Sequence, residues 1–408
     1  MAHYLAQGLV PPKRHTQIRR KGGELYYEEL MGEEGFSSDS SLLYHRYMPS
    51  PVLDSQVWDL GDMSLTPNHP LLPMHLRLHD LFAPKEVAQT DAVTGRRLVV
   101  GNGDCRLLYV VAGKASPWYR NGIGDELVYV ERGKARVETV FGSFEVAQGD
   151  YVIMPRATTH RWVPRRSQRD PLRLFCVETN SHVTAPRRYL SKFGQLLEHS
   201  PFCERDLRLP SGPLLAEDVG AKPDERTEVY IKHRGGPHGV VGTVHALPFH
   251  PLDVVGWDGC LYPYVLNIAD YEPLTGRVHQ PPPTHQVFEA NNLVVCNFVP
   301  RKVDYHPLAI PVPYYHSNVD SDEVMFYADG DYEARKGSGI AKGSISLHPA
   351  AHPHGPQPGA MEGSIGMERF DETAVMVDTF APLLLGEAAR AVNDPAYPHS
   401  WLTPSQRP

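Results

Sequence analysis

From Glu126 to Trp162 the sequence reads ELVYVERG, KARVETVFG, SFEVAQGD and YVIMPRATTHRW. These are short runs rich in β-branched and aromatic residues, separated by glycine and proline turn signals. Such runs at close spacing are typical of an all-β sandwich or barrel. We therefore predict strands joined as hairpins at Arg132-Gly133, Phe141-Gly142 and Gln148–Asp150.

The rest of the chain follows the same pattern. Its 408 residues include 38 prolines and 34 glycines, which interrupt the sequence every few residues. We therefore expect a fold dominated by β-strands, of the jelly-roll type, with few and short helices. The best helical stretches are Arg188–His199 and Ala381–Val392.

A second segment repeats the order of features seen in the first. Glu323–Tyr327 (EVMFY) is followed by a Gly-Asp turn, by Gly343–His348 (GSISLH) and by a loop rich in proline and histidine. We interpret this as an internal duplication that gives two related barrels. We predict two domains. Residues 1–250 form an extended N-terminal arm and a degenerate barrel, and residues 251–408 form a second barrel that carries the catalytic site. The arm is expected to pack on a neighbouring element or subunit.

Composition excludes several classes of protein. Forty Lys and Arg against 48 Asp and Glu give a net charge of −8, which argues against nucleic acid or an anionic membrane as the main partner. No apolar run approaches the roughly 20 residues of a membrane span, and the first residues lack a signal core. Five scattered cysteines suit free thiols in a reducing cytoplasm, which is the predicted location.

Three residues of the second barrel could form a metal site: His316, Glu323 and His354. Two neutral imidazoles and one carboxylate on one face of an octahedral ion leave three positions open, as in non-haem Fe(II) oxygenases. The alternative for each histidine taken singly is a hydrogen-bonded loop residue. Asp322 is the alternative carboxylate, although Glu323 opens the β run.

The first barrel has fewer potential metal ligands at the corresponding positions. Asn121 and Glu126 stand where the second barrel has His316 and Glu323, and one histidine, His160, follows Pro155. One histidine and one glutamate make a weak metal site, so we predict that this barrel is structural and free of metal.

Five blocks of the second half carry a family resemblance. They are HPLDVVGWDGCLYPYVLN (His250–Asn267), PPPTHQVFEANNLVVCNFVPR (Pro281–Arg301), PYYHSN (Pro313–Asn318), GDYEARKG (Gly330–Gly337) and SLHPAAHPHGP (Ser346–Pro356). In these blocks, which cover about a quarter of the chain, the sequence resembles the homogentisate 1,2-dioxygenase family of the cupin superfamily. The missing glycine-rich opening of the plant and animal enzymes places the chain in a divergent, bacterial-type branch.

The resemblance implies that Fe(2+) is bound by His316, Glu323 and His354. It implies that His285 is the acid–base residue, and that Tyr332, His348 and His354 contact the substrate. His348 is also a candidate for orienting a ligand from behind. Arg301 and Lys302 are nearby in sequence as cations for an acetate group.

The implied reaction is cleavage of homogentisate by O2 to maleylacetoacetate, in the catabolism of tyrosine and other aromatic compounds. One alternative keeps the iron chemistry but uses another hydroquinone or a gentisate-like acid. A second alternative is a non-catalytic two-barrel protein for binding or storage. The resemblance also implies a homo-oligomer, a trimer or hexamer.

Overall fold

A computed structural model describes residues 3–165, 170–236, 239–279, 282–402 and 405–406. Its secondary structure is mostly β-strand, with three short α-helices among these residues: α1 (Pro84–Val87), α2 (Ala360–Ser364) and α3 (Glu387–Ala391). The predicted all-β fold with few short helices is therefore confirmed. Within the described ranges, no helix is long and apolar enough to span a membrane.

The chain divides into two compact units that are not continuous in sequence. The first unit comprises residues 1–61, 84–96 and 110–267, and the second comprises residues 62–83, 97–109 and 268–408. The expected boundary lay between residues 250 and 251. In the structure the long C-terminal segment of the second unit begins at Ile268, and two segments from the first hundred or so residues join it. Sequence order alone does not show such an exchange, because strand pairing is a tertiary property.

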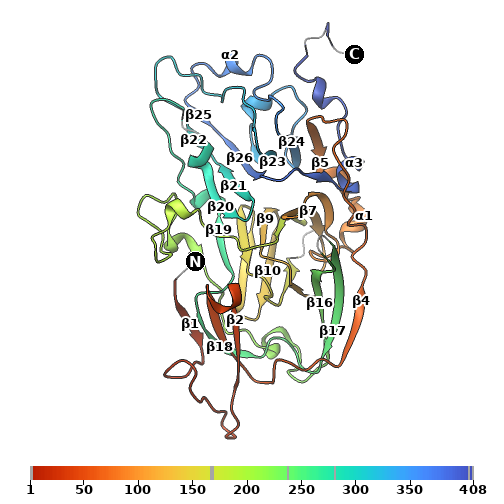
Figure 1. The fold of residues 1–408 in the computed structure, drawn as a ribbon, viewed down its shortest axis with the longest axis vertical. Coiled ribbons are helices and arrows are strands. Elements are labelled where there is room, and N and C mark those ends of the chain that lie inside the picture. The colour runs from red at the N-terminus through yellow and green to blue at the C-terminus, as the bar shows by residue number, and fades with distance from the viewer. Residues whose placement is uncertain (1–2, 166–169, 237–238, 280–281, 403–404, 407–408) are drawn as a thin grey trace. The chain divides into compact units, whose positions relative to one another are not determined.

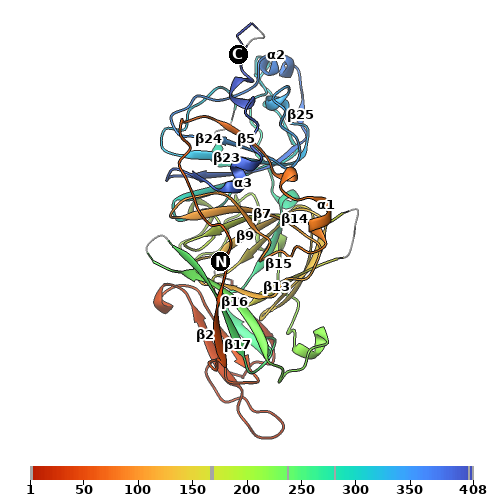
Figure 2. The same cartoon turned by 90° about the vertical axis from the view of Figure 1, so that its right-hand side faces the viewer.

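The first unit contains three sets of neighbouring strands (Figures 1 and 2). One sheet has the order β1-β18-β3-β2, a second has the order β11-β10-β13-β8-β16-β17-β4, and a further set follows the order β15-β19-β12-β9-β14. The strands are β1 (Leu5–Gly8), β2 (Tyr27–Gly32), β3 (Ser40–His45), β4 (Asp54–Trp58), β8 (Trp118–Asn121), β9 (Glu126–Arg132), β10 (Lys134–Thr139), β11 (Gly142–Ala147), β12 (Asp150–Met154), β13 (His160–Pro164), β14 (Leu172–Thr179), β15 (Leu207–Arg208), β16 (Thr227–Arg234), β17 (Val240–Leu247), β18 (Val254–Gly259) and β19 (Tyr264–Asn267).

Only one of the three predicted hairpins forms. β10 and β11 pair in antiparallel register on either side of Val140–Phe141. β9 instead pairs with β12 and β14, and β10 with β11 and β13. Consecutive strands therefore alternate between two sheets at Arg132-Gly133 and at Gln148–Asp150. The turn residues were correctly located, but a corner between sheets and a hairpin turn use the same residue types.

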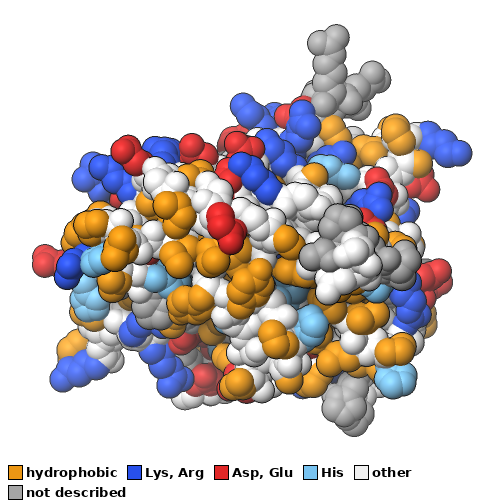
Figure 3. All heavy atoms as spheres, turned by 90° about the horizontal axis from the view of Figure 1, so that it is seen from above, with side chains coloured by type: hydrophobic (Ala, Val, Ile, Leu, Met, Phe, Trp, Pro, Cys, Tyr) orange, Lys and Arg blue, Asp and Glu red, His pale blue; other side chains and the backbone are white. Residues whose placement is uncertain are grey.

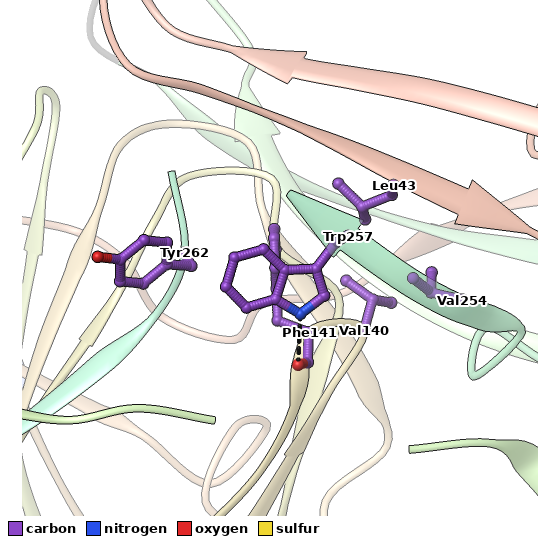
Figure 4. Close-up of a cluster of buried hydrophobic side chains, with 6 residues drawn as sticks. All are labelled: Leu43, Val140, Phe141, Val254, Trp257 and Tyr262. Carbon is purple, nitrogen blue, oxygen red and sulfur yellow. Dashed lines mark hydrogen bonds between the residues drawn. The ribbon is translucent and has the colours of Figure 1, made fainter. Parts of the chain in front are cut away.

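The N-terminal arm packs on its own chain within the first unit. β1 and β3 both pair with β18, and Trp257 of β18 stands opposite Leu43 of β3. Trp257 is fully buried and donates its indole N–H to the carbonyl of Phe141 at 2.9 Å (Figure 4). Val140, Val254 and Tyr262 complete this apolar cluster. Burial of such large side chains is the main term that holds the arm in place.

A buried ion pair also fixes the end of the arm. His45, at the end of β3, contacts Asp253 at 2.8 Å and Glu29 of β2 at 3.0 Å. Burial lowers the pKa of His45, but the hydrogen bonds to Asp253 and then to Glu29 outweigh burial and raise it to about 9. The imidazole is therefore charged at neutral pH.

The second unit is built around one sheet with the order β20-β21-β26-β23-β24-β5. β22 and β25 form a separate two-stranded antiparallel sheet, and β6 pairs with β27. β7 (Cys105–Ala112) spans the division between the units. The other strands are β5 (Met74–Arg77), β6 (Arg97–Gly101), β20 (Gln286–Ala290), β21 (Leu293–Phe298), β22 (Arg301–Lys302), β23 (Asp322–Gly330), β24 (Ser344–His348), β25 (Arg369–Phe370), β26 (Glu372–Thr379) and β27 (Leu384–Leu385).

The predicted helix at Arg188–His199 is wrong. That segment has only a single 3-10 turn, Arg187–Tyr189. Gly194 has a positive φ of 87°, which a helix interior does not allow. The predicted helix at Ala381–Val392 is confirmed in its second half by α3, whereas its first half contributes strand β27.

Candidate metal centre and pocket

The candidate ligands come from a strand end and from two loops that are bridged to each other. Glu323 is the second residue of β23, where it pairs with His348 of β24 and with Asp378 of β26. His316 and His354 lie in loops that exchange two backbone hydrogen bonds, of 2.8 and 2.9 Å. A Cβ at Gly355 would stand 2.8 Å from the Cα of Tyr315, so a glycine there permits this close approach.

The three predicted ligands converge. Their donor atoms all lie within 4.8 Å of one another. His316 Nε2 lies 3.5 Å from Glu323 Oε2, and His354 Nε2 lies 3.4 Å from Glu323 Oε1. Glu323 and His354 are buried and His316 is half-buried, so one side of the cluster remains accessible.

The orientation of both imidazoles suits metal binding. His316 Nδ1 lies 3.2 Å from the carbonyl of Tyr314, and His354 Nδ1 lies 3.1 Å from the carbonyl of His352. A carbonyl can only accept, so in the neutral ring Nδ1 holds the proton and the Nε2 lone pair faces Glu323. His354 Nε2 is buried and has no hydrogen-bond partner among the described residues. Backbone partners that fix the tautomer in this way are usual for metal-bound histidines.

The electrostatics favour an ionised carboxylate at the centre. Burial raises the pKa of Glu323, but the interactions with His316, His348 and His354 outweigh burial and hold that pKa well below its usual value. The same interaction with Glu323 raises the pKa of His316. A carboxylate and two imidazoles together attract a cation.

Asp322 does not face this cluster. Its two carboxylate oxygens accept the backbone N–H groups of Ala350 and Leu383, both at 2.7 Å. Successive residues of a strand point to opposite faces, so Glu323 and Asp322 cannot both turn toward the histidines. The geometry therefore favours Glu323 over the alternative.

His348 lies behind Glu323. It is fully buried and its Nδ1 is 3.0 Å from Glu323 Oε1, while its Nε2 is 2.9 Å from the hydroxyl of Tyr397. Burial lowers the pKa of His348 to about 3, so the ring is neutral. A carboxylate only accepts, so Nδ1–H donates to Glu323 and Tyr397 donates to Nε2. This position suits a residue that orients Glu323 and does not suit the predicted direct contact with substrate.

A pocket with a cavity volume of about 180 Å³ opens beside the cluster. His316 and Glu323 line it, as do the predicted residues His285, Tyr332 and Arg301. Its apolar wall includes Phe298, Met325, Phe370 and Met376. An apolar cavity with a few convergent polar groups is the usual form of a small-molecule site.

His285 ends the 3-10 turn Pro282–His285, and its ring stacks on Phe298 with centroids 4.7 Å apart. Burial, followed by the charges of Arg301 and His279, lowers the pKa of His285 to about 3. An acid–base residue usually has a pKa near neutrality, and the pKa of His285 in the free pocket lies well below that. The ring is neutral, and its buried Nδ1 has no partner among the described residues. Pro281, which opens the quoted block, lies outside the described residues.

Sequence reasoning missed Arg335 and Asp378. Arg335 lines the pocket and donates to the hydroxyl of Tyr327 at 2.9 Å and to the carbonyl of Gly355 at 2.6 Å. Asp378 lines the pocket from β26, directly opposite Glu323, and burial followed by the charge of Glu323 raises its pKa well above the usual value. The signal for Arg335 was its place in the GDYEARKG block, whereas only the strand register reveals Asp378.

In the first unit, the residues that correspond to the candidate metal ligands already form hydrogen bonds with other protein groups. Glu126 accepts hydrogen bonds from Tyr119 at 2.7 Å, from Asn121 at 2.9 Å and from Arg96 at 2.9 Å. His160 Nδ1 lies 3.0 Å from the carbonyl of Thr158. The absence of a metal at these corresponding positions stays a prediction, and the buried guanidinium of Arg96 beside Glu126 agrees with it.

Comparisons with known proteins find several relatives of this chain. Residues 283–406 match the family model "Homogentisate 1,2-dioxygenase C-terminal". A protein of Saccharolobus solfataricus assigned as a dioxygenase is 37% identical over 407 residues, which cover 99% of this chain and 100% of the relative. The homogentisate 1,2-dioxygenase of Bradyrhizobium diazoefficiens is 27% identical over 381 residues, which cover 87% of this chain and 79% of that enzyme. The chain belongs to the homogentisate 1,2-dioxygenase family.

This member of the family is therefore a ring-cleaving dioxygenase that acts on an aromatic substrate with O2. Its fold is mostly β-strand with few short helices, as the sequence predicted, and cupin barrel proteins are among its structural neighbours. Among solved structures, a cupin 2 conserved barrel domain protein from Leptotrichia buccalis is 10% identical and covers 79% of this chain and 100% of its own, with a TM-score of 0.30.

Proposed function

We propose that this dioxygenase cleaves homogentisate to maleylacetoacetate and that it uses Fe(2+) held by His316, Glu323 and His354. The observation that supports this most is the convergence of two imidazoles and one carboxylate at the wall of an apolar pocket. When bound, Fe(2+) supplies neighbouring open positions for the substrate and O2, and a positive charge that lowers the pKa of a phenol.

His285 is proposed to accept the proton that the bound ring hydroxyl releases. Its Nδ1 is buried without a described partner, and stacking on Phe298 fixes the plane of the ring. A pKa of about 3 makes it a weak base in the free enzyme. An anionic substrate in the pocket would raise that pKa, because a nearby negative charge favours the imidazolium. Proton transfer at Nδ1 is therefore coupled to substrate binding.

Arg335 is the cation that best suits the acetate group. Both partners of its guanidinium in the pocket wall, Tyr327 and Gly355, are neutral, so its charge stays available to an anion. Arg301 is less suitable because it already pairs with Glu372 at 2.8 Å. Tyr332 lines the same pocket and is proposed to bind the second hydroxyl or the carboxylate.

We further propose a homo-oligomer, a trimer or hexamer, in the cytoplasm. The second unit exposes a set of large hydrophobic side chains, and hydrophobic groups gather on the face shown in Figure 3. Large exposed apolar areas are typical of subunit interfaces. Light scattering of the purified chain tests this proposal. The exposed residues are Tyr305, Leu308, Ile310, Tyr314, Tyr315, Val319, Met361 and Ile365.

The test of the reaction is anaerobic loading with Fe(2+), followed by homogentisate and air. We expect a near-ultraviolet rise from maleylacetoacetate that requires iron and disappears in His316→Ala and His354→Ala. The matched control is His233→Ala, which changes a histidine bonded to Thr243 in the first unit and should keep full activity.

Each other outcome has a definite meaning. Bound iron without product would reject homogentisate and retain the dioxygenase, and gentisate and substituted hydroquinones would then be tried. Absence of bound iron would reject the proposed metal site. Product formation that survives both histidine substitutions would reject these residues as ligands.

A further inference from the structure

A second group of potential metal ligands lies in the first unit. Glu33 follows β2 in the N-terminal arm, Asp125 precedes β9, and His182 follows β14. One donor atom from each side chain lies within 4.8 Å of the other two. Three segments that are far apart in sequence therefore bring two carboxylates and one imidazole to one place.

The donor atoms of these three residues lie close together, but His182 Nδ1 forms no hydrogen bond with either carboxylate. His182 Nδ1 lies 2.9 Å from Glu33 Oε1 and 3.8 Å from Asp125 Oδ1. This nitrogen is buried, yet neither contact has the geometry of a hydrogen bond. His354 Nε2 in the candidate metal centre shows the same combination, with Glu323 Oε1 3.4 Å away. Donors that point at a common centre, and not along a mutual hydrogen bond, are what a cation site requires.

Tyr264 gives an independent observation at the same place. Its side chain is 4% exposed, and its hydroxyl has no hydrogen-bond partner among the described residues. Tyr264 of β19 pairs with Ile153 of β12, which pairs with Leu127 of β9, two residues after Asp125. Burial raises the pKa of Tyr264, and the charges of Asp125 and Glu33 are among the groups that raise it further. A buried hydroxyl without a partner is unfavourable, and a ligand with its water would satisfy it.

The group is also held rigidly. Asp125 Oδ1 accepts the backbone N–H of Arg156 at 2.8 Å, and Oδ2 accepts that of Val183 at 2.9 Å. The second of these bonds fixes the loop that presents His182. Each carboxylate oxygen can accept more than one bond, so Asp125 keeps capacity for a cation.

We propose that Glu33, Asp125 and His182 form a second, structural site for a divalent cation of the zinc type, which ties the N-terminal arm to the barrel of the first unit. Imidazole and carboxylate ligands together suit Zn(2+), and two carboxylates balance its charge. Zinc accepts four ligands in such sites, and a water beside Tyr264 would complete the set. The cation closes a long loop between the arm and β9, which stabilises the folded chain. This site is independent of the proposed reaction.

The alternative to a bound cation is a protonated His182 that pairs with the two carboxylates. Without a metal, Asp125 and then Glu33 raise the pKa of His182 to about 10, which would make a salt-bridged imidazolium. The two arrangements differ in a measurable way, because the imidazolium has no affinity for metal.

The test uses the full chain with His354→Ala, in which the candidate catalytic centre is disabled. We expect this parent to bind one Zn(2+) by calorimetry and by elemental analysis after dialysis. Glu33→Gln and His182→Gln should each weaken binding by about 10-fold or more, by analogy with losses at metal-site residues. Glu34→Gln, a change at the neighbouring exposed acid, is the matched control and should bind as the parent does.

Hydrogen exchange gives a second readout, which reports on the arm and not on the amount of metal bound. Zn(2+) should slow exchange in Tyr27–Gly32 of the parent and leave that segment unchanged in His182→Gln. Asp125 is left intact because its carboxylate also accepts the backbone N–H groups of Arg156 and Val183, which hold the surrounding loops. Absence of zinc binding in the parent, equal binding by Glu33→Gln and His182→Gln, or unchanged exchange in the arm would each overturn the proposal.

Discussion

The Tyr397→Phe substitution tests whether the residues behind Glu323 control the metal site. It removes only the hydroxyl that lies 2.9 Å from His348 Nε2. His348 cannot compensate by moving its proton, because a proton on Nε2 would turn the Nδ1 lone pair toward the carboxylate 3.0 Å away. The substitution therefore leaves a buried acceptor unsatisfied and loosens the group that orients Glu323.

Two magnitudes follow from this geometry. An unsatisfied buried group costs about 1–3 kcal/mol of folding free energy. Loss of a residue that supports a metal ligand lowers metal affinity by about 10–100-fold. We therefore expect a modest loss in the free energy of unfolding and a large loss in Fe(2+) affinity, although the proposed ligands His316, Glu323 and His354 are all unchanged.

Tyr44→Phe is the matched control. Tyr44 is also fully buried, and its hydroxyl donates to Asp258 at 2.9 Å within the first unit. It should lower the free energy of unfolding by a similar amount and leave iron affinity unchanged. Denaturant unfolding of the metal-free chains and anaerobic Fe(2+) titration measure the two quantities. Equal iron affinity in Tyr397→Phe and the wild type would refute the reasoning.

Three further substitutions test other parts of the molecule. His285→Phe should retain iron but lower turnover by about 10²–10⁴, the usual share of general acid–base catalysis, and full activity in stopped-flow assays would end that role. The pKa of His45 lies above its unfolded value, so its stabilisation is complete below pH 6.5 and is lost as the pH rises through about 9. His45→Gln should abolish this pH-dependent contribution of about 3 kcal/mol to the free energy of unfolding, which urea unfolding at several pH values measures. An unchanged pH profile would contradict the assignment. Arg96→Met should lower the free energy of unfolding by about 3–5 kcal/mol because it strands Glu126 in the barrel interior. Substitution of the exposed Arg132 should have little effect, and equal losses in the two variants would disprove the buried role of Arg96.

The class of fold and the set of candidate ligands could both be predicted from local features of the sequence. Short β runs between glycine and proline turns are a local property, so the strands were predicted close to where they lie. The residues His316, Glu323 and His354 were also identified from local patterns and from a family resemblance. Their proximity is a result of the structure.

The pairing of the strands, the carboxylate that faces the histidines and the residues behind that carboxylate all depend on long-range contacts. Gly133 marks a corner between two sheets, although its local sequence is equally suitable for a hairpin. Glu323 and not Asp322 faces the histidines because adjacent residues of a strand point to opposite faces. Asp378 and Tyr397 reach the same site from β26 and from the C-terminal segment. Such contacts join residues distant in sequence, and their positions are set by strand register and packing, which no local pattern records.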